Sequence, residues 1–107
     1  MYARVAELTV IAEKRKGLIE VVKNEYVPAL KRAPGFVDYI AINAEKNAAH
    51  VISISFWKTK DDGERFYREQ YPPILSKLKP FLKSQVDVKA YNVDFSTFHH
   101  ITAAVSA

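Results

Sequence analysis

The chain has 107 residues, of which 49% are hydrophobic and 26% are charged, and its formal net charge at pH 7 is +4. This size and balance are typical of one globular domain. The chain has no cysteine, which excludes disulfides, thiolate metal sites and cysteine nucleophiles. No apolar run approaches the ~20 residues of a membrane-spanning helix. The N-terminal stretch "MYARVAELTVIAEKRKG" does not have the pattern of a signal peptide, so we expect a cytoplasmic protein with no membrane partner.

Charged residues of both signs are interleaved along the chain rather than separated by sign. A nucleic-acid-binding protein usually concentrates its basic residues in one stripe and adds exposed aromatic residues or a known motif. We find no such stripe or motif. We therefore interpret the charges as solvated helix faces and predict no nucleic-acid partner.

The first third of the chain predicts a strand, a helix and a turn. Residues 2–11 are rich in β-branched and aliphatic residues and contain no breaker, which predicts a strand. Apolar residues then recur at helical spacing over 17–33, which predicts a helix. Pro28 lies inside this helix and cannot donate a backbone hydrogen bond, so we expect a kink near it. Pro34 and Gly35 end the helix. The predicted buried stripe comprises Leu18, Val22, Tyr26, Ala29 and Leu30.

The remainder predicts a hairpin, a second helical region and a last strand. Residues 36–43 and 50–57 have strand composition and are joined by a short polar loop, so we expect a β-hairpin. Thr59 has the position of a helix N-cap, and its helix is predicted to run to about Tyr71. The remaining predicted elements are a short helix over 74–82, after an interruption at Pro72 and Pro73, and a strand over 85–95.

The element order β-α-β-β-α-β predicts an α+β fold of the ferredoxin-like type. In this fold a four-stranded antiparallel sheet carries both helices on one face. The strands are apolar on both faces, because Ile52, Ile54 and Phe56 alternate with Val51 and Trp57. An apolar face that no helix covers marks an interface. We therefore expect a homodimer in which the sheets of two copies pack together.

These features resemble those of a known family. The helix that ends "LKRAPGF" and the strand that runs into "SFWKTKDDGERF" are similar to segments of the dimeric α+β barrel proteins, and within them of the antibiotic-biosynthesis-monooxygenase-like (ABM) domains. The resemblance covers about residues 2–95 and implies a dimeric α+β barrel. Members of this family include cofactor-free oxygenases of polycyclic phenols, haem-degrading enzymes and enzymes that act on quinones or small signalling molecules. The fold alone does not choose among them.

Departures from the family pattern narrow the choice among these activities. Haem-degrading relatives hold iron with a His on the second helix, and an Asn on the first strand assists. This chain has no His on its second predicted helix, and Glu7 and Leu8 stand near the expected Asn, so we predict no haem. Cofactor-free oxygenases share the strand-terminal Trp, here Trp57, but commonly carry an Asn where this chain has Ser53.

The third predicted strand supplies the candidate site. Ser53, Ser55 and Trp57 alternate along one face, and two small hydroxyl side chains beside an indole leave room for a pocket. Cofactor-free oxygenation of a small aromatic or quinol-type molecule would need an aromatic cavity and one or two hydrogen bonds to an enolate or phenolate. It would need no cofactor and no metal. The predicted catalytic residues are Trp57, Ser53 and Glu7, with Glu7 as the base. The predicted substrate-binding residues are Ser55, Phe66, Tyr67, Tyr71, Tyr26 and Tyr39, with Lys77 or Arg68 as candidates for stabilising the anion.

Structural interpretations of the same residues stay open. Trp and Tyr often serve cores or interfaces, and a carboxylate such as Glu7 often forms a surface ion pair. The chain would then be a non-catalytic small-ligand-binding or stress-associated protein, or a dimer module without a pocket. We predict a domain over 1–95 and a tail over 96–107 that packs on the partner subunit. His99 and His100 are adjacent and would point to opposite faces of a strand, so we predict no metal site there.

Overall fold

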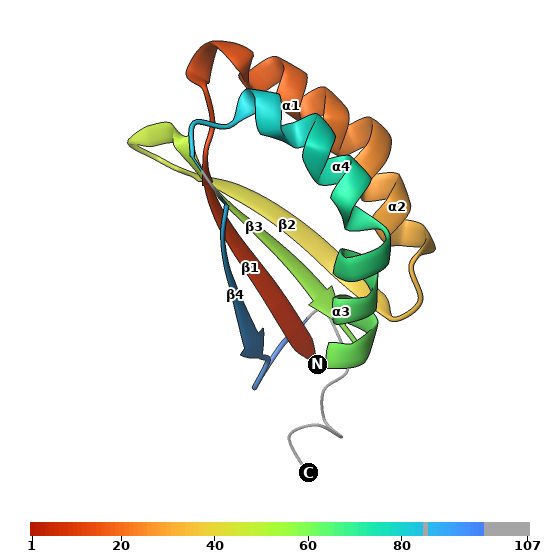
Figure 1. Cartoon of the computed structure of the whole chain (residues 1–107). Coiled ribbons are helices and arrows are strands. Elements are labelled where there is room, and N and C mark those ends of the chain that lie inside the picture. Colours follow the sequence, from red (N-terminus) through yellow and green to blue (C-terminus); the bar gives the residue numbers. More distant parts are fainter. Residues whose placement is uncertain (85, 98–107) are drawn as a thin grey trace.

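The computed structural model describes residues 1–84 and 86–97, and it contains the predicted succession of strands and helices (Figure 1). The strands are β1 (Tyr2–Thr9), β2 (Phe36–Ala44), β3 (Asn47–Trp57) and β4 (Asp87–Asn92). The α-helices are α1 (Arg15–Val21), α2 (Val27–Arg32), α3 (Lys60–Glu69) and α4 (Tyr71–Leu78). Shorter helical turns are η1 (Ala12–Lys14), η2 (Val22–Tyr26) and η3 (Lys79–Phe81). The predictions for His99, His100 and the rest of the tail beyond residue 97 lie outside the described residues.

The four strands form one antiparallel sheet in the order β2-β3-β1-β4. β1 and β3 occupy the middle, so β2 and β4 are the edge strands. The helices cover one face of this sheet (Figure 1). This is the ferredoxin-like α+β arrangement predicted from the element order, and the prediction is confirmed.

The first helical segment is continuous from η1 to α2, but it changes its winding in the middle. η2 is a π-helical turn, and Pro28 follows it as the second residue of α2. A wider turn accommodates a residue whose missing N–H breaks the regular hydrogen-bond ladder. The predicted kink at this place therefore takes the form of a π-turn. The predicted end of the helix is also observed, since Gly35 has a φ of +81°, which a side chain would strain.

The second helical segment differs from its prediction at one point. Thr59 caps α3 as predicted, because its hydroxyl accepts a hydrogen bond from the Asp62 backbone N–H at 3.1 Å. Pro72 and Pro73, however, do not interrupt a helix. They occupy the first turn of α4, where a missing N–H costs nothing, and the break comes at Gln70. At the other boundaries, β3 begins earlier than predicted, and β4 is shorter.

Strand register decides which side chains lie toward the helices. Tyr2 pairs with Trp57 across β1 and β3, and both side chains are buried in the core. The predicted helix stripe joins them, since Leu18, Tyr26 and Leu30 are buried in the same core. No helix in the described part of the chain is long and apolar enough to cross a membrane.

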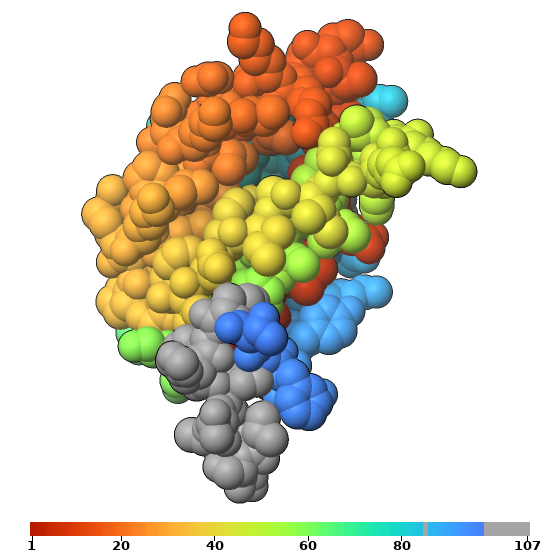
Figure 2. Space-filling model, turned by 180° about the vertical axis from the view of Figure 1, so that it is seen from behind, coloured from red at the N-terminus to blue at the C-terminus, as the bar shows by residue number. Residues whose placement is uncertain are grey.

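The opposite sheet face, which we call the outer face, carries apolar side chains and none of the described helices (Figure 1). Figure 2 shows the strands from behind, with β2 in yellow, β3 in green and β4 in blue at the surface. Ile40 and Ile42 are 39% and 49% exposed, and Tyr91 is 51% exposed. Both faces of the sheet therefore carry apolar side chains, as the strand sequences predict. The apolar residues of the outer face are Val5, Ile40, Ile42, Ile52, Ile54, Phe56 and Tyr91.

Candidate functional site

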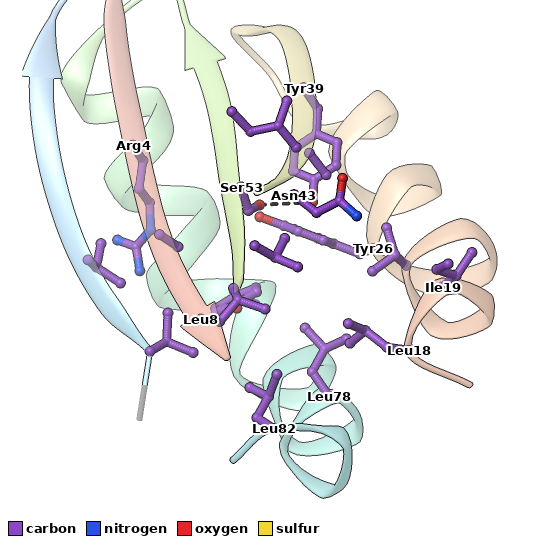
Figure 3. A pocket seen from close by; sticks show the side chains of 18 of the residues that line it. Arg4, Leu8, Leu18, Ile19, Tyr26, Tyr39, Asn43, Ser53, Leu78 and Leu82 are labelled. Atoms are coloured by element: carbon purple, nitrogen blue, oxygen red, sulfur yellow. Dashed lines mark hydrogen bonds between the residues drawn. The ribbon is translucent and has the colours of Figure 1, made fainter. Parts of the chain in front are cut away.

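A cavity of about 330 Å³ lies between the inner sheet face and the helices α1, η2 and α4 (Figure 3). Its floor is a row of small side chains, because Ser53 on β3 pairs with Ala6 on β1 and with Ala41 on β2. Small residues at three adjacent positions leave the space that larger ones would fill. We call this space the tyrosine cavity, after four side chains that line it: Tyr26, Tyr39, Tyr67 and Tyr71.

The four tyrosines pack against one another and hold each other in place. Tyr26 makes an edge contact with Tyr39, with ring centroids 5.2 Å apart, and a tilted contact with Tyr71 at 5.4 Å. Tyr67 and Tyr71 meet edge-on at 4.9 Å. Edge and tilted contacts of this kind are favourable for aromatic rings. The rings thus form an aromatic wall, and Leu18, Leu78 and Leu82 line another part of the cavity (Figure 3).

Hydroxyl groups at this wall are linked by short hydrogen bonds. Trp57 Nε1 donates to Ser55 Oγ at 2.9 Å, and Ser55 Oγ lies 2.7 Å from the Tyr67 hydroxyl. Tyr67 in turn lies 2.5 Å from the Tyr26 hydroxyl. A separate bond joins Ser53 Oγ, as donor, to the Tyr39 hydroxyl at 2.8 Å.

The indole group gives the longer chain a direction. An indole N–H can only donate, so Ser55 Oγ accepts from Trp57. Ser55 is 1% exposed, and its own proton needs a partner, which Tyr67 provides. Tyr67 is hydrogen-bonded in turn to Tyr26, and either hydroxyl can be the donor of that bond. Trp57 therefore acts on the cavity through two hydroxyl groups rather than by contact.

Burial keeps the four phenols protonated. Desolvation raises the pKa of Tyr26 well above its usual value, with a further contribution from its tyrosine neighbours. Desolvation also raises the pKa of Tyr67 to about 12, although its hydrogen bonds with Ser55 and Tyr26 and the charge of Arg4 oppose this rise. The pKa values of Tyr39 and Tyr71 are raised by the same cause. At neutral pH these groups are hydrogen-bond donors and not bases.

Arg4 is a site residue that the sequence analysis missed. It lines the cavity from β1, next to the small-residue floor, and its guanidinium lies 3.8 Å from the centroid of the Tyr67 ring. The sequence feature that could have identified Arg4 is its position in the alternation of β1. Tyr2, Arg4, Ala6 and Leu8 alternate on one face, and a charged residue in that series points toward the helices.

The structure brings together five of the predicted site residues and leaves the others outside the cavity. Ser53 and the four tyrosines line it. Trp57 is 0% exposed and Ser55 lies behind the wall, so neither meets a bound molecule directly. Phe66 is in the core and borders a different hollow, next to α2 and α3. Trp57, which the sequence predicts to be catalytic, therefore does not contact the cavity.

Glu7 is not the predicted base of this cavity. It pairs with Ile52 across β1 and β3, which places it on the outer face, and it is exposed. Its phase in the strand is opposite to that of Arg4, so the sheet itself separates it from the cavity. The candidate anion-stabilising residues also lie elsewhere: Lys77 pairs with Glu25, and Arg68 pairs with its neighbour Glu69. Among the described residues, no cluster of His, Cys, Asp and Glu has the make-up of a metal site.

Comparisons with known proteins identify the family and the fold of the chain. A family model described as antibiotic biosynthesis monooxygenase matches residues 1–71. Among curated proteins, no sequence matches the chain.

Solved structures show the same fold at low sequence identity. A putative antibiotic biosynthesis monooxygenase from Nitrosomonas europaea is 14% identical, with a TM-score of 0.77 over 89% of this chain and 100% of that one. A conserved protein from Methanosarcina mazei Go1 is 19% identical, with a TM-score of 0.77 over 84% and 89%. SnoaB from Streptomyces nogalater, described as a cofactor-independent oxygenase, is 16% identical, with a TM-score of 0.70 over 90% and 95%.

Proposed function

Since this chain belongs to the antibiotic biosynthesis monooxygenase family, we propose that it is a cofactor-independent monooxygenase of a small aromatic or quinol-type molecule. The observation that carries the proposal is the tyrosine cavity, where aromatic rings, phenol donors and one guanidinium surround a space of about 330 Å³. This volume is at the lower end of the range for small-molecule sites. The likeness to SnoaB, a cofactor-independent oxygenase, supports the same reaction class.

The reaction needs no external reductant, because the substrate supplies the electrons. A molecule with an acidic CH₂ group between aromatic or carbonyl groups gives up a proton to water and becomes an electron-rich anion. The anion transfers one electron to O₂, and the resulting radical pair combines to form a C–O bond and a peroxide anion. A proton converts this anion to the hydroperoxide, which loses water and leaves a carbonyl. One oxygen atom of O₂ thus enters the product, and the other leaves as water.

The cavity residues have three tasks in this scheme. Tyr26 and Tyr39 donate hydrogen bonds to the oxygen on which the negative charge is delocalised. Arg4 stabilises the anion by its charge. The leucine and tyrosine side chains exclude water, which strengthens both interactions.

Oxygen uptake tests the proposal. The purified protein is screened aerobically with anthrone-type and hydroquinone-type compounds, and oxygen consumption is followed with an electrode. We expect turnover that Tyr26→Phe and Tyr39→Phe each reduce by about 10 to 100-fold, the usual cost of one stabilising donor. Ser76→Ala, at an exposed hydroxyl on α4, is the control and leaves turnover unchanged. Turnover that survives both cavity substitutions contradicts the proposal.

One observation favours a second function, binding without turnover. None of the described residues that line the cavity is Asp, Glu or His, so the site has donors but no ordinary base. A non-catalytic small-ligand-binding or stress-associated protein would have such a site. Saturable quenching of Trp57 fluorescence by an aromatic compound, without oxygen uptake across the screen, would identify this second function.

The proposal also includes a cytoplasmic homodimer that pairs through the outer face. The apolar side chains left exposed by the helices support it, since an exposed patch of this kind marks an interface. The mass of the particle in solution tests the dimer.

A further inference from the structure

The charges around the tyrosine cavity have one sign. Its described lining residues include Arg4, Arg15 and Lys23 and no acidic residue. By contrast, α3 has cations that are paired with carboxylates, as Lys60 is with Glu64 and Arg65 is with Asp62. Among the described residues, Arg4, Arg15 and Lys23 form no ion pair, so the positive charge at the cavity has no paired counter-charge.

A second hollow continues this pattern next to β4. It has a volume of about 490 Å³ and shares Arg4, Tyr71 and Leu82 with the tyrosine cavity. It adds the exposed residues Lys79 and Lys83, and its described lining residues again include no acid. The two hollows therefore meet at Arg4, and Lys79 and Lys83 add positive charge in the second hollow.

Arg4 is the residue at which these observations converge. It is half-buried, and among the described residues it has no carboxylate partner. Its guanidinium contacts the face of the Tyr67 ring, which offsets only part of the cost of removing a charge from water. A guanidinium in this position still has donors available, and they match the oxygen atoms of an anion.

We propose that the tyrosine cavity takes up its aromatic or quinol-type molecule as a preformed anion, with the negative charge against Arg4 and the ring among the tyrosines. This inference rests on the proposed function and names the charge state of its substrate. The absence of Asp, Glu and His from the described lining fits it, because a molecule that is already ionised needs no base from the protein. Lys79 and Lys83 would attract such a molecule toward the opening.

A pair of coloured compounds provides the test. 2-Hydroxy-1,4-naphthoquinone is an acid that is ionised at pH 7, whereas its 2-methoxy ether has nearly the same shape and no charge. Binding of each to the full chain is measured by quenching of Trp57 fluorescence and by calorimetry. We expect the anion to bind at least about tenfold more tightly than the ether, as one charge-assisted hydrogen bond allows. The visible absorption of the hydroxy compound also reports its pKa, which we expect to fall on binding because Arg4 favours the anion.

Three variants assign the preference to Arg4. Arg4→Gln should reduce the ratio of the two affinities to about one and leave the pKa of the bound acid unshifted, since the charge is gone. Arg4→Lys keeps the charge and should retain part of the preference, which separates lost charge from lost folding. Arg32→Gln removes the same charge from an exposed position of α2 and should leave the preference unchanged. Circular dichroism checks that each variant is folded.

The outcomes are distinct from those of the oxygenase test. Equal affinity for the two compounds, no saturable binding of either, or an anion preference that Arg4→Gln leaves intact would each overturn the inference. An anion preference that depends on Arg4, in a protein that consumes no oxygen, would uphold it while the monooxygenase proposal fails. Oxygen uptake with uncharged molecules alone would do the reverse.

Discussion

Trp57 shows how a residue can matter to a cavity that it does not touch. Its side chain is fully buried between Phe36 and Phe66, with ring centroids at 5.6 and 5.3 Å. Its N–H nevertheless donates to Ser55, the first of a series of hydrogen-bonded hydroxyl groups that ends at Tyr26. The sequence could place Trp57 at the end of a strand, but whether its face was the covered one depended on strand register.

Substituting Trp57 by Phe should show how much its side chain and its hydrogen bond to Ser55 contribute to stability. We expect Trp57→Phe to lower the free energy of unfolding by about 2 kcal/mol, because a buried donor and part of a core side chain are lost together. Ser55→Ala should remove the same hydrogen bond from the other side. Urea denaturation of the two single variants and the double variant therefore forms a cycle, in which the double variant should lose less than the sum. Additive losses would show that the hydrogen bond contributes nothing.

The raised pKa of Tyr67 predicts a pH dependence of stability. An unfolded Tyr67 loses its proton near pH 10, whereas the folded one does so at about 12. Between these values the unfolded state binds fewer protons, so the free energy of unfolding falls as the pH rises. The loss from Tyr67 over this range amounts to about 2 to 3 kcal/mol.

Denaturation at a series of pH values from 8 to 12 measures this effect. The stability of the wild type should be steady below about pH 10 and decline above it. Tyr67→Phe cannot ionise at this position, so its curve should decline less steeply. Parallel curves for the two proteins would contradict a shifted Tyr67.

At the scale of elements, close approach between α3 and the sheet depends on Gly63. A Cβ at this position would lie 2.9 Å from a ring atom of Tyr2 and 3.1 Å from one of Trp57. These rings belong to the core, so they cannot easily move aside. The missing side chain thus lets the N-terminal part of α3 lie directly on β1 and β3.

Gly63→Ala should therefore destabilise the protein, although alanine is the better helix former. We expect a net loss of about 1 to 3 kcal/mol from overpacking, set against a gain of at most about 1 kcal/mol in helix propensity. Thermal denaturation measures it, and Glu64→Ala, at the exposed neighbouring position, should change the midpoint little. A stabilised Gly63→Ala variant would show that α3 can shift away from the sheet.

The elements also show what the sequence could and could not predict. Helical spacing, the Thr59 cap and the turn at Gly35 depend on neighbouring residues, so they were predictable. The cavity floor depends on the alignment of Ala6, Ala41 and Ser53 across three strands. Each is an ordinary small residue in its own strand, and only the register makes them a row. Arg4 and Glu7 differ in role for the same reason, since their phases place them on opposite faces.

At the scale of the whole molecule, the described helices cover one face of the sheet and leave the other uncovered (Figure 1). The helices bury the inner face around Tyr2, Leu30 and Trp57. On the outer face, Ile54 pairs with Val5 on one side and with Ile40 on the other. A sheet with two apolar faces is stable in water when both are covered. A second copy of the chain offers a face of matching chemistry, and a two-fold axis would bring the two together.

Light scattering after gel filtration tests this pairing. We expect a particle of twice the chain mass of 12.2 kDa. Ile40→Lys should raise the dissociation constant by about 100-fold or more, because each dimer would then bury two unpaired ammonium groups. Ile19→Lys is a matched control, since Ile19 is 38% exposed on α1 and Ile40 is 39% exposed on β2. Only the change on β2 should shift the mass toward the monomer. A wild type that stays monomeric, or equal effects of the two substitutions, would mean that the outer face does not pair copies of this chain.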